Sequence, residues 1–431
     1  MASSELEKMW RTEDYWAIWF SVVILAGAIT GLIHDVPRLG TWVSDPLTAL
    51  SADMAVPLAA LALALGLLLT TGVRVMGEDW RPFFAGYLAI FLLSILSFVA
   101  SGQQSVKAVG LEYALWALAF GLIVANTVGT PRWLLAGAKS EMYIKTGLVL
   151  LGAEILFSEI LRLGAPGLIV AWAVTPTVIL VMWFFGTRWL RMASKSFVII
   201  VAAATSVCGV SAAIATAAAC RAKRQELTLA VGMTMIFTVL MMVFMPAIAK
   251  LMGLQPAVAG AWLGGTIDST GAVVAAGALL GEEAERVAAV IKMIQNILIG
   301  LVAFFVAVYW VTRVDRDPTA PRPSLMEVWY RFPKFILGFV LASIFFSFVV
   351  VPVAGEAQTG AILDASKVVR GWLFCLAFVA IGLESNFKEL ASQLVGGKPI
   401  ILYIVGQSFN IFLTLLVAWL VFGGILFGGA P

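Results

Sequence analysis

Long apolar runs without a well-placed charge dominate this chain. Because roughly 20 helical residues cross the ~30 Å hydrocarbon core of a bilayer, we interpret each run of about that length as a membrane span. The expected spans are residues 16–33, 55–73, 83–100, 111–128, 146–161, 167–187, 227–249, 286–311, 335–353, 371–387 and 399–422. Only 12% of the 431 residues are charged, against roughly a quarter in soluble domains, so lipid must be the main solvent.

The fold expected from these runs is all-α: a polytopic bundle of about eleven transmembrane helices in one domain, residues 1–431. Lys and Arg are enriched on cytoplasmic flanks of membrane proteins. If the N-terminus is inside, twenty of the 28 basic residues lie inside, seven lie outside, and Lys292 lies within a span. We therefore expect N-in, C-out topology. The first run is not followed by a small-residue cleavage pattern, which favours a retained span over a signal peptide.

Two further apolar stretches, residues 197–220 and 256–281, are broken by small polar residues. Basic clusters flank 197–220 on both sides, so both of its ends are expected in the cytoplasm, with a break at SVCG from Ser206. The second stretch reads GGTIDSTG at its centre. Non-helical backbone at membrane depth is tolerated only where it is buried in protein or lines a cavity. We expect two re-entrant hairpins from opposite faces; broken full spans and Gly-rich packing helices are the alternatives.

The chain resembles itself at an offset of 230 residues. VLLGAEILFSE from Val149 aligns with VAIGLESNFKE from Val379. The identical pairs are Val149/Val379, Gly152/Gly382, Glu154/Glu384, Phe157/Phe387 and Glu159/Glu389. The charge distribution makes the two copies run in opposite directions, which predicts inverted repeats of five spans each, approximately 55–190 and 197–425. Transporters with this pattern place their substrate site near the bilayer midplane.

Few polar residues interrupt the spans. Lys292, Gln295 and Asn296 are spaced i, i+3 and i+4, so they share one helix face and are candidates for solute contact, although Lys292 could instead snorkel outward. Glu154 is expected inside its span, where an ionised carboxylate needs compensation by protonation, an ion pair or water. Asp268 has three interpretations: a helix cap, a Na⁺ ligand, or a proton carrier.

The hairpin tips are candidates for anion binding. Short helices that begin after Gly209 and after Thr270 would present unpaired amide donors and a positive dipole end. The expected solute-binding residues of the tips are Thr205, Ser206, Cys208, Gly209 and Ser211 in the first and Gly265, Thr266, Ser269 and Thr270 in the second. Asp268 and Glu154 are the candidates for holding the coupling ion.

The stretch TSVCGVSAAIA from Thr205, the stretch AGAWLGGTIDSTGAVVAAGALLG and the downstream Lys292 resemble the sulfate exporter family of bacterial membrane proteins. The likeness covers roughly residues 110–420. It implies a transporter of the inner membrane. The family usually has a His-Glu pair where this chain has Asp268-Ser269, and a basic residue where it has Glu154. Both departures lower the local positive charge and make another anion or a cation-coupled mechanism more plausible.

We therefore expect a secondary active transporter of a small anion such as sulfate, a sulfonate or a carboxylate, working by alternating access. A cation/proton antiporter is the alternative. A single histidine, His34, and three cysteines without metal-site spacing, Cys208, Cys220 and Cys375, argue against an enzyme and a resident cofactor. The expected partners are the solute, a coupling Na⁺ or H⁺ at Asp268 and membrane lipids, but no nucleic acid. The sequence leaves a homodimer open.

Overall fold

The computed structural model describes residues 9–108, 113–155, 157–315, 326–386, 388 and 397–426. Within these ranges every regular element is a helix, apart from an isolated β-bridge between Trp42 and Gln103. Among the described residues, seven helical stretches are long and apolar enough to cross a membrane: Ala55–Val75, Trp80–Ser101, Ile160–Trp189, Gln225–Leu251, Glu282–Val314, Phe335–Glu384 and Lys398–Phe422. The all-helical membrane class is confirmed, while the number of eleven spans stays a prediction.

The helices of the structure differ from the eleven expected spans in two ways. The spans expected at 335–353 and 371–387 lie in one helical stretch, Phe335–Glu384, which is kinked at Gly355, where φ is +78°. Residue 387 itself lies outside the described residues. Other expected spans correspond to helices of only 15 to 17 residues, at Glu13–Ile29, Tyr113–Thr127 and Ser140–Glu154. Membrane crossing by these shorter helices stays a prediction.

The bounds expected for the span 146–161 are wrong. The helix there begins at Ser140 and ends at Glu154, because Ile155 is extended, with φ −98° and ψ 117°. Glu154 is therefore the last residue of a helix and not a residue of its interior. Apolar residues continue past the break, so no change in composition marks the end of the helix.

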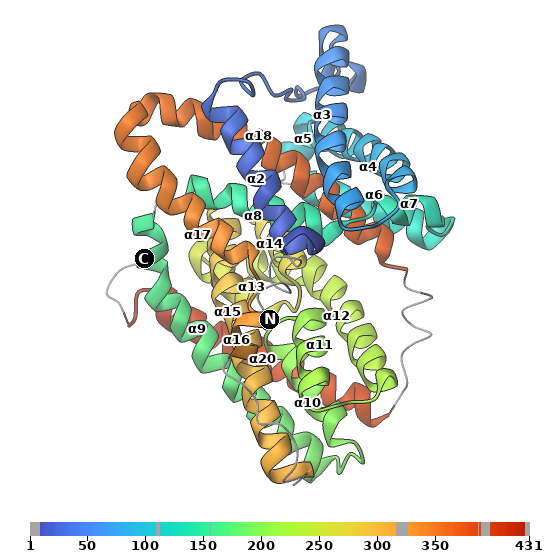
Figure 1. Ribbon diagram of the computed structural model, residues 1–431, viewed down its shortest axis with the longest axis vertical. Helices are drawn as coiled ribbons and strands as arrows, with labels where there is room; N and C mark the ends of the chain where they lie inside the picture. The colour runs from blue at the N-terminus through green and yellow to red at the C-terminus, as the bar shows by residue number, and fades with distance from the viewer. Residues whose placement is uncertain are drawn as a thin grey trace. The chain divides into compact units, whose positions relative to one another are not determined.

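The chain divides into two compact units, each built from sequence-distant segments. Unit 1 comprises Met1–Ile160 and Lys334–Asn386. Its helices are α2 (Glu13–Ile29), η1 (Pro46–Ala49), η2 (Ala52–Met54), α3 (Ala55–Val75), α4 (Trp80–Ser101), α5 (Gln104–Ala108), α6 (Tyr113–Thr127), α7 (Arg132–Gly137), α8 (Ser140–Glu154), α17 (Phe335–Phe345), η5 (Phe346–Val350) and α18 (Val351–Glu384) (Figure 1). Helices α8 and α18 pack on each other, with α6 against α18 and α17 against α8.

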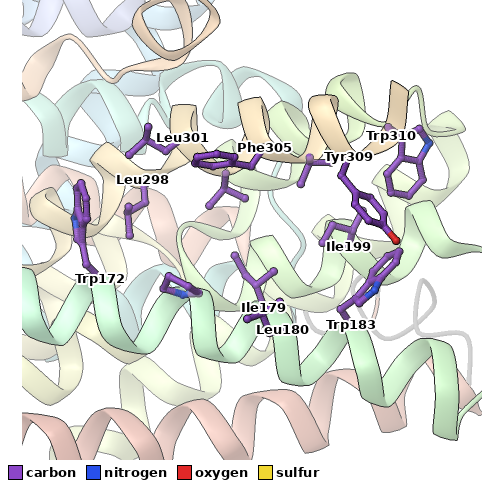
Figure 2. A pocket seen from close by; sticks show the side chains of 13 residues that line it. Trp172, Ile179, Leu180, Trp183, Ile199, Leu298, Leu301, Phe305, Tyr309 and Trp310 are labelled. Atoms are coloured by element: carbon purple, nitrogen blue, oxygen red, sulfur yellow. The ribbon is translucent and has the colours of Figure 1, made fainter. Parts of the chain in front are cut away.

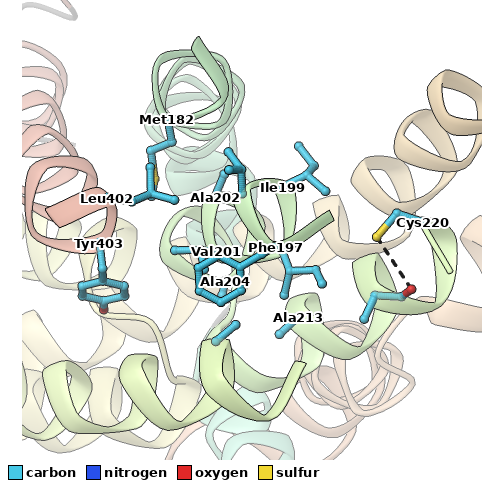
Figure 3. Packing of buried hydrophobic residues seen from close by; sticks show 14 of the residues in the cluster. Met182, Phe197, Ile199, Val201, Ala202, Ala204, Ala213, Cys220, Leu402 and Tyr403 are labelled. Carbon is cyan, nitrogen blue, oxygen red and sulfur yellow. Dashed lines mark hydrogen bonds between the residues drawn. The ribbon is translucent and has the colours of Figure 1, made fainter. Parts of the chain in front are cut away.

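Unit 2 comprises Leu161–Pro333 and Phe387–Pro431. Its helices are α9 (Phe157–Phe184), whose first turn belongs to unit 1, η3 (Phe185–Trp189), α10 (Lys195–Ser206), α11 (Gly209–Ala219), α12 (Arg224–Leu251), α13 (Pro256–Thr266), α14 (Thr270–Ala278), α15 (Glu282–Tyr309), η4 (Trp310–Asp315), α16 (Met326–Arg331) and α20 (Lys398–Phe422). An apolar cluster joins α10 and α11 to Met182 of α9 and to Leu402 and Tyr403 of α20 (Figure 3). The expected single domain and the repeats 55–190 and 197–425 are not tested by this division and stay predictions.

Both expected breaks separate pairs of short helices in unit 2. Between α10 and α11 the chain leaves helical geometry at Val207 and Cys208, and Cys208 is extended, with φ −156° and ψ 118°. Between α13 and α14 it does so at Ile267 and Ser269, which are also extended. In both places the helix ends among small or hydroxyl-bearing residues.

The helix pair α13–α14 folds back beside the first half of α15. A side-chain carbon at Gly260, early in α13, would lie 2.6 Å from the carbonyl oxygen of Ala284, and one at Gly277, late in α14, would lie 2.8 Å from the Cα atom of Glu285. The two outer ends of the pair thus lie at the same level of α15. The break between them reaches further along α15, where Lys292 bonds to the carbonyl oxygen of Ile267.

The pair α10–α11 uses the second half of α15 in the same way. Ala203 of α10 and Ala215 of α11 belong to one buried cluster with Leu298, Ile299 and Ala303 of α15. The two helix pairs therefore approach the middle of α15 from its two ends, and their breaks meet there. Their re-entry from opposite membrane faces stays a prediction.

Candidate functional site

The two helix breaks are joined directly by a backbone hydrogen bond. The amide of Gly209, at the start of α11, donates to the carbonyl oxygen of Asp268 at 2.7 Å. Gly209 fits there because it has no side chain: an added Cβ would lie 2.5 Å from the Cγ2 atom of Thr234. We call the place where the breaks meet the crossing, formed by residues 205–209 and 265–270.

Lys292 holds both breaks through its ammonium group. Its Nζ atom donates to the carbonyl oxygens of Val207, at 2.6 Å, and Ile267, at 2.8 Å, and to Gln295 Oε1 at 2.8 Å. The residue is only 1% exposed, so its side chain does not snorkel outward. Each helix C-terminus carries roughly half a negative charge, and α10 and α13 both end at these carbonyls. One lysine therefore compensates the ends of two helices.

The amide side chain of Gln295 repeats this bridging pattern. The Nε2 atom of Gln295 donates to the carbonyl oxygens of Ser206, at 2.9 Å, and Gly265, at 3.1 Å. Thr175 of α9 also donates to Ser206, at 3.0 Å. Since the last carbonyls of a helix lack partners within the helix, these donors satisfy groups that would otherwise be buried and unpaired.

The C-terminal helix α20 supplies a second polar face that the sequence analysis missed. Asn410 Nδ2 donates to the carbonyl oxygens of Thr205, at 3.1 Å, and Thr266, at 3.4 Å, and Gln407 Nε2 also donates to Thr266, at 3.2 Å. Thr414 donates to Asn410 Oδ1 at 3.0 Å. These three polar residues and Tyr403 are spaced i, i+4, i+7 and i+11 in an apolar helix, a signal that could have revealed them.

Asp268 is the acidic residue of the crossing. It is 1% exposed, and its Oδ2 atom accepts a hydrogen bond from the hydroxyl of Tyr403. The residue precedes α14 and its carbonyl accepts the first amide of α11, so it lies near two positive helix N-termini. The N-cap of α14 is Ser269, without a side-chain cap. The interpretation of Asp268 as a helix cap is therefore wrong.

Several buried oxygen atoms of the crossing and its surroundings have no hydrogen-bond partner. Polar atoms inside proteins are nearly always paired, so such a group marks a place for another donor, a water or an ion. Within the described part of the chain, the unpartnered atoms around the crossing are Thr205 Oγ1, Thr266 Oγ1, Asp268 Oδ1, Asn296 Oδ1 and Gln407 Oε1. All five are oxygens.

The expected site residues of unit 2 divide into those at the crossing and those beside it. Asn296 Nδ2 donates to Thr270 Oγ1 at 3.0 Å, so the third member of the Lys292 stripe also faces the crossing. Cys208 is buried in the break itself, and Ser269 is half-buried. Ser211 lies in the first turn of α11, and its side chain is exposed.

Glu154 belongs to unit 1 and is paired within that unit. Its two carboxylate oxygens accept hydrogen bonds from Arg370 Nε, at 2.8 Å, and Nη2, at 3.0 Å. Arg370 also lies over the ring of Phe374, 5.3 Å from its centroid. Of the interpretations left open for Glu154, the ion pair is the one that the structure contains.

The α8–α18 pair contains a related contact at its other end. Ser140, at the start of α8, donates at 2.9 Å to Glu384, the last residue of α18. Glu154 and Glu384 are 230 residues apart, and so are Ser140 and Arg370. The 230-residue offset found in the sequence therefore relates Ser140 to Arg370 and Glu154 to Glu384. The Glu154–Arg370 and Ser140–Glu384 contacts thus occupy equivalent positions in the two copies. Of the repeat residues, Phe387 and Glu389 lie outside the described residues.

The described part of the chain contains no cluster of side chains that could hold a metal. Among the described residues, no three His, Cys, Asp or Glu side chains come together. A cation at Asp268 would therefore take its other ligands from neutral oxygens, which suits Na⁺ better than a transition metal.

The long apolar helices and the proteins to which this chain is similar together define a multi-pass membrane protein. The family model described as "Conserved hypothetical protein 698" matches residues 85–403. Over 385 residues the chain is 54% identical to a UPF0324 membrane protein of Rhodopirellula baltica, covering 89% of this chain and 71% of that relative. The chain belongs to this family of membrane proteins.

Other relatives are also named as membrane proteins, and their names do not state a solute. A UPF0324 membrane protein of Nitratidesulfovibrio vulgaris is 49% identical over 376 residues, covering 86% of this chain and 65% of that protein's length. The UPF0324 inner membrane protein YeiH of Escherichia coli is 25% identical over 342 residues, covering 77% of this chain and 90% of YeiH. No solved structure matches the chain.

Proposed function

We propose that the protein is a secondary active transporter of the bacterial inner membrane that carries a small anion by alternating access. The observation that carries this proposal is the crossing: two helix breaks meet beside the middle of α15 in a buried polar centre. Helices α9, α15 and α20, which contribute side chains to this centre, belong to stretches long enough to span a bilayer. Broken helices at membrane depth are the common way in which transporters expose backbone donors and acceptors to a solute and a coupling ion.

The chemistry of the crossing favours an oxyanion such as sulfate, a sulfonate or a carboxylate. Helices α11 and α14 both begin at the crossing and direct amide donors towards it. The unpartnered hydroxyls of Thr205 and Thr266 can donate further hydrogen bonds. The expected residues Ser206, Cys208, Ser269 and Thr270 would complete the donors around the solute.

Asp268 gives the proposal its coupling step. An ionised carboxylate beside the N-termini of α11 and α14 interacts with the same partial positive charges that would bind an anion, so the two compete. Binding of H⁺ or Na⁺ by Asp268 would remove that competition and raise the affinity for the anion. Coupling then follows from a single group, without a role for Glu154, whose charge Arg370 already balances.

Alternating access would use the inverted repeats and the N-in, C-out topology expected from the sequence. The exchange of the Glu154–Arg370 and Ser140–Glu384 contacts by the 230-residue offset supports the repeats. A homodimer and the absence of catalysis are further parts of the proposal.

A ligand screen by thermal unfolding tests the proposal. Purified protein is heated with sulfate, sulfonates, carboxylates and Na⁺ at several pH values, and the screen is repeated with Asp268→Ala and with the matched control Asp364→Ala, whose carboxylate is largely exposed. We expect at least one anion to stabilise the wild type and the control, with a dependence on Na⁺ or pH that Asp268→Ala loses. An unchanged response in Asp268→Ala would contradict the proposed site.

A cation/proton antiporter is the second candidate, favoured by the observation that all five unpartnered atoms around the crossing are oxygens. This function requires Na⁺/H⁺ exchange in vesicles without any anionic solute. Anions would then leave the thermal unfolding of the protein unchanged, while Na⁺ would raise its midpoint. The same screen therefore separates the two candidates.

A further inference from the structure

An apolar groove lies between α9 and α15 in unit 2 (Figure 2). Its volume is about 450 Å³, and Ile199 of α10 contributes to its lining. Both α9 and α15 belong to stretches that are long and apolar enough to cross a membrane. Large apolar side chains such as Leu180 and Phe305 are 57% and 65% exposed along it. The groove is thus a feature of a surface that faces hydrocarbon.

The length of the groove matches one leaflet of a bilayer. Its lining extends from Leu298 of α15 to Trp310, the first residue of η4, a distance of twelve residues or roughly 18 Å at helical rise. Half of the hydrocarbon core is roughly 15 Å thick. Leu298 lies one turn beyond Gln295, so the inner end of the groove is level with the crossing. The groove therefore extends from the expected middle of the bilayer to one of its surfaces.

Aromatic side chains with polar tips gather at the outer end. The ring of Trp183 lies edge-on to those of Tyr309, at 5.7 Å between centroids, and Trp310, at 6.3 Å. Tryptophan and tyrosine are enriched at membrane interfaces, because their rings prefer hydrocarbon and their N–H and O–H groups prefer water. This end of the groove has the composition of a membrane interface.

Positive charge follows immediately beyond the aromatic residues. Arg188 lies five residues after Trp183 in η3, and Arg313 lies three residues after Trp310 in η4, and both side chains are exposed. Arg191 follows three residues after Arg188, beyond the end of η3. Guanidinium groups bind phosphate through paired hydrogen bonds, and basic sites between membrane helices bind anionic lipid headgroups.

We propose that this groove binds an anionic phospholipid, with one acyl chain between α9 and α15 and the headgroup phosphate at Arg188 and Arg313. A zwitterionic lipid would fill the groove equally well but lacks the net charge that the arginines favour. The bound chain would contact Ile199 and Leu298, on two helices that form the crossing. The inference depends on the membrane location and not on the proposed solute.

Lipid retention by the purified protein tests the inference. The protein is delipidated in detergent and titrated with phosphatidylglycerol or with phosphatidylcholine of the same acyl chains, while native mass spectrometry counts bound lipids. Three variants complete the set: Arg188→Gln/Arg313→Gln, the groove-filling Val302→Trp, and the control Arg74→Gln at an exposed arginine of α3. Since each basic residue near a membrane surface contributes about fivefold to the binding of an anionic lipid, we expect the double variant to bind phosphatidylglycerol roughly 30-fold more weakly.

The expected pattern has two further parts. Val302→Trp should release both lipids, and Arg74→Gln should bind as the wild type does. Equal affinity of the wild type for the two lipids, or unchanged phosphatidylglycerol binding by the double variant, would overturn the headgroup site. If Val302→Trp changed the oligomeric state and left lipid binding intact, the groove would be an interface between copies of this chain and the inference would fail.

Discussion

The two units bury charge in different ways. In unit 1, Glu154 and Arg370 are bonded to each other by two short contacts, so each charge is the partner of the other. In unit 2, Lys292 and Asp268 bind backbone carbonyls and a tyrosine hydroxyl, and each faces the ends of two helices. The first arrangement is a closed pair that fixes helices. In the second, helix dipoles compensate each charge, and the proposed binding of a solute and a coupling ion requires this arrangement.

The largest effect is expected from breaking the closed pair. Arg370→Met leaves Glu154 buried without its partner and should lower the free energy of unfolding by about 3 to 5 kcal/mol. Glu154→Met/Arg370→Met should regain most of this loss, because both charges are then absent. Unfolding by SDS in mixed micelles measures both, with Arg74→Met as the exposed control. If Glu154→Met/Arg370→Met were as unstable as Arg370→Met, the two charges would not be each other's main partners.

Lys292→Met should lower the free energy of unfolding by about 3 kcal/mol, since two buried carbonyls lose a charged donor. The double variant distinguishes this arrangement from the ion pair of unit 1. Asp268→Asn/Lys292→Met should not regain stability, because the carbonyls of Val207 and Ile267 stay unpaired. The same SDS titration applies. Full recovery in this double variant would mean that the two residues act as an ordinary ion pair.

Gly209→Ala should destabilise the protein by about 2 kcal/mol, because its Cβ would overlap the Cγ2 atom of Thr234. Thr234→Ser removes that carbon and keeps the hydroxyl that donates to Ala230. Gly209→Ala/Thr234→Ser should therefore unfold closer to the wild type. Thermal unfolding with and without ligand measures the effect. If Gly209→Ala/Thr234→Ser were as unstable as Gly209→Ala, the loss of stability would not come from overlap with Thr234.

The smallest effect is expected from Tyr403→Phe, which removes the hydroxyl that donates to Asp268. We expect a loss of about 1.5 kcal/mol in the free energy of unfolding, together with an altered Na⁺ or pH dependence of ligand binding. Tyr87→Phe is the matched control, since the buried Tyr87 hydroxyl donates to the carbonyl oxygen of Ala62 in unit 1. Tyr87→Phe should leave the ion dependence unchanged, and the same result for Tyr403→Phe would contradict the role of Asp268 as the coupling group.

Much of the crossing was predictable from local sequence. Glycine, serine and threonine inside apolar stretches located both breaks, because these residues tolerate backbone that leaves helical geometry. The i, i+3, i+4 spacing of Lys292, Gln295 and Asn296 placed them on one face, and that face does meet the breaks. Local spacing carries this information because a helix fixes which of its own residues lie together.

The partners of these groups were beyond local inference. Lys292 was expected to bind solute or to snorkel, and it binds the carbonyls of two distant helix ends instead. Asn410 and Tyr403 lie more than 130 residues after the breaks that they contact, so their role depends on tertiary packing alone. Glu154 was ambiguous for the same reason, since its partner Arg370 lies 216 residues away.

Transport by the reconstituted protein tests the central claim most directly. Proteoliposomes that contain the wild type, Asp268→Asn or the exposed control Asp364→Asn are loaded against a Na⁺ or pH gradient, and the uptake of radiolabelled sulfate, or of the anion with the largest thermal shift, is measured. The account predicts saturable, gradient-dependent uptake by the wild type and the control, and uptake at the level of empty vesicles for Asp268→Asn. Undiminished coupled uptake by Asp268→Asn would contradict it.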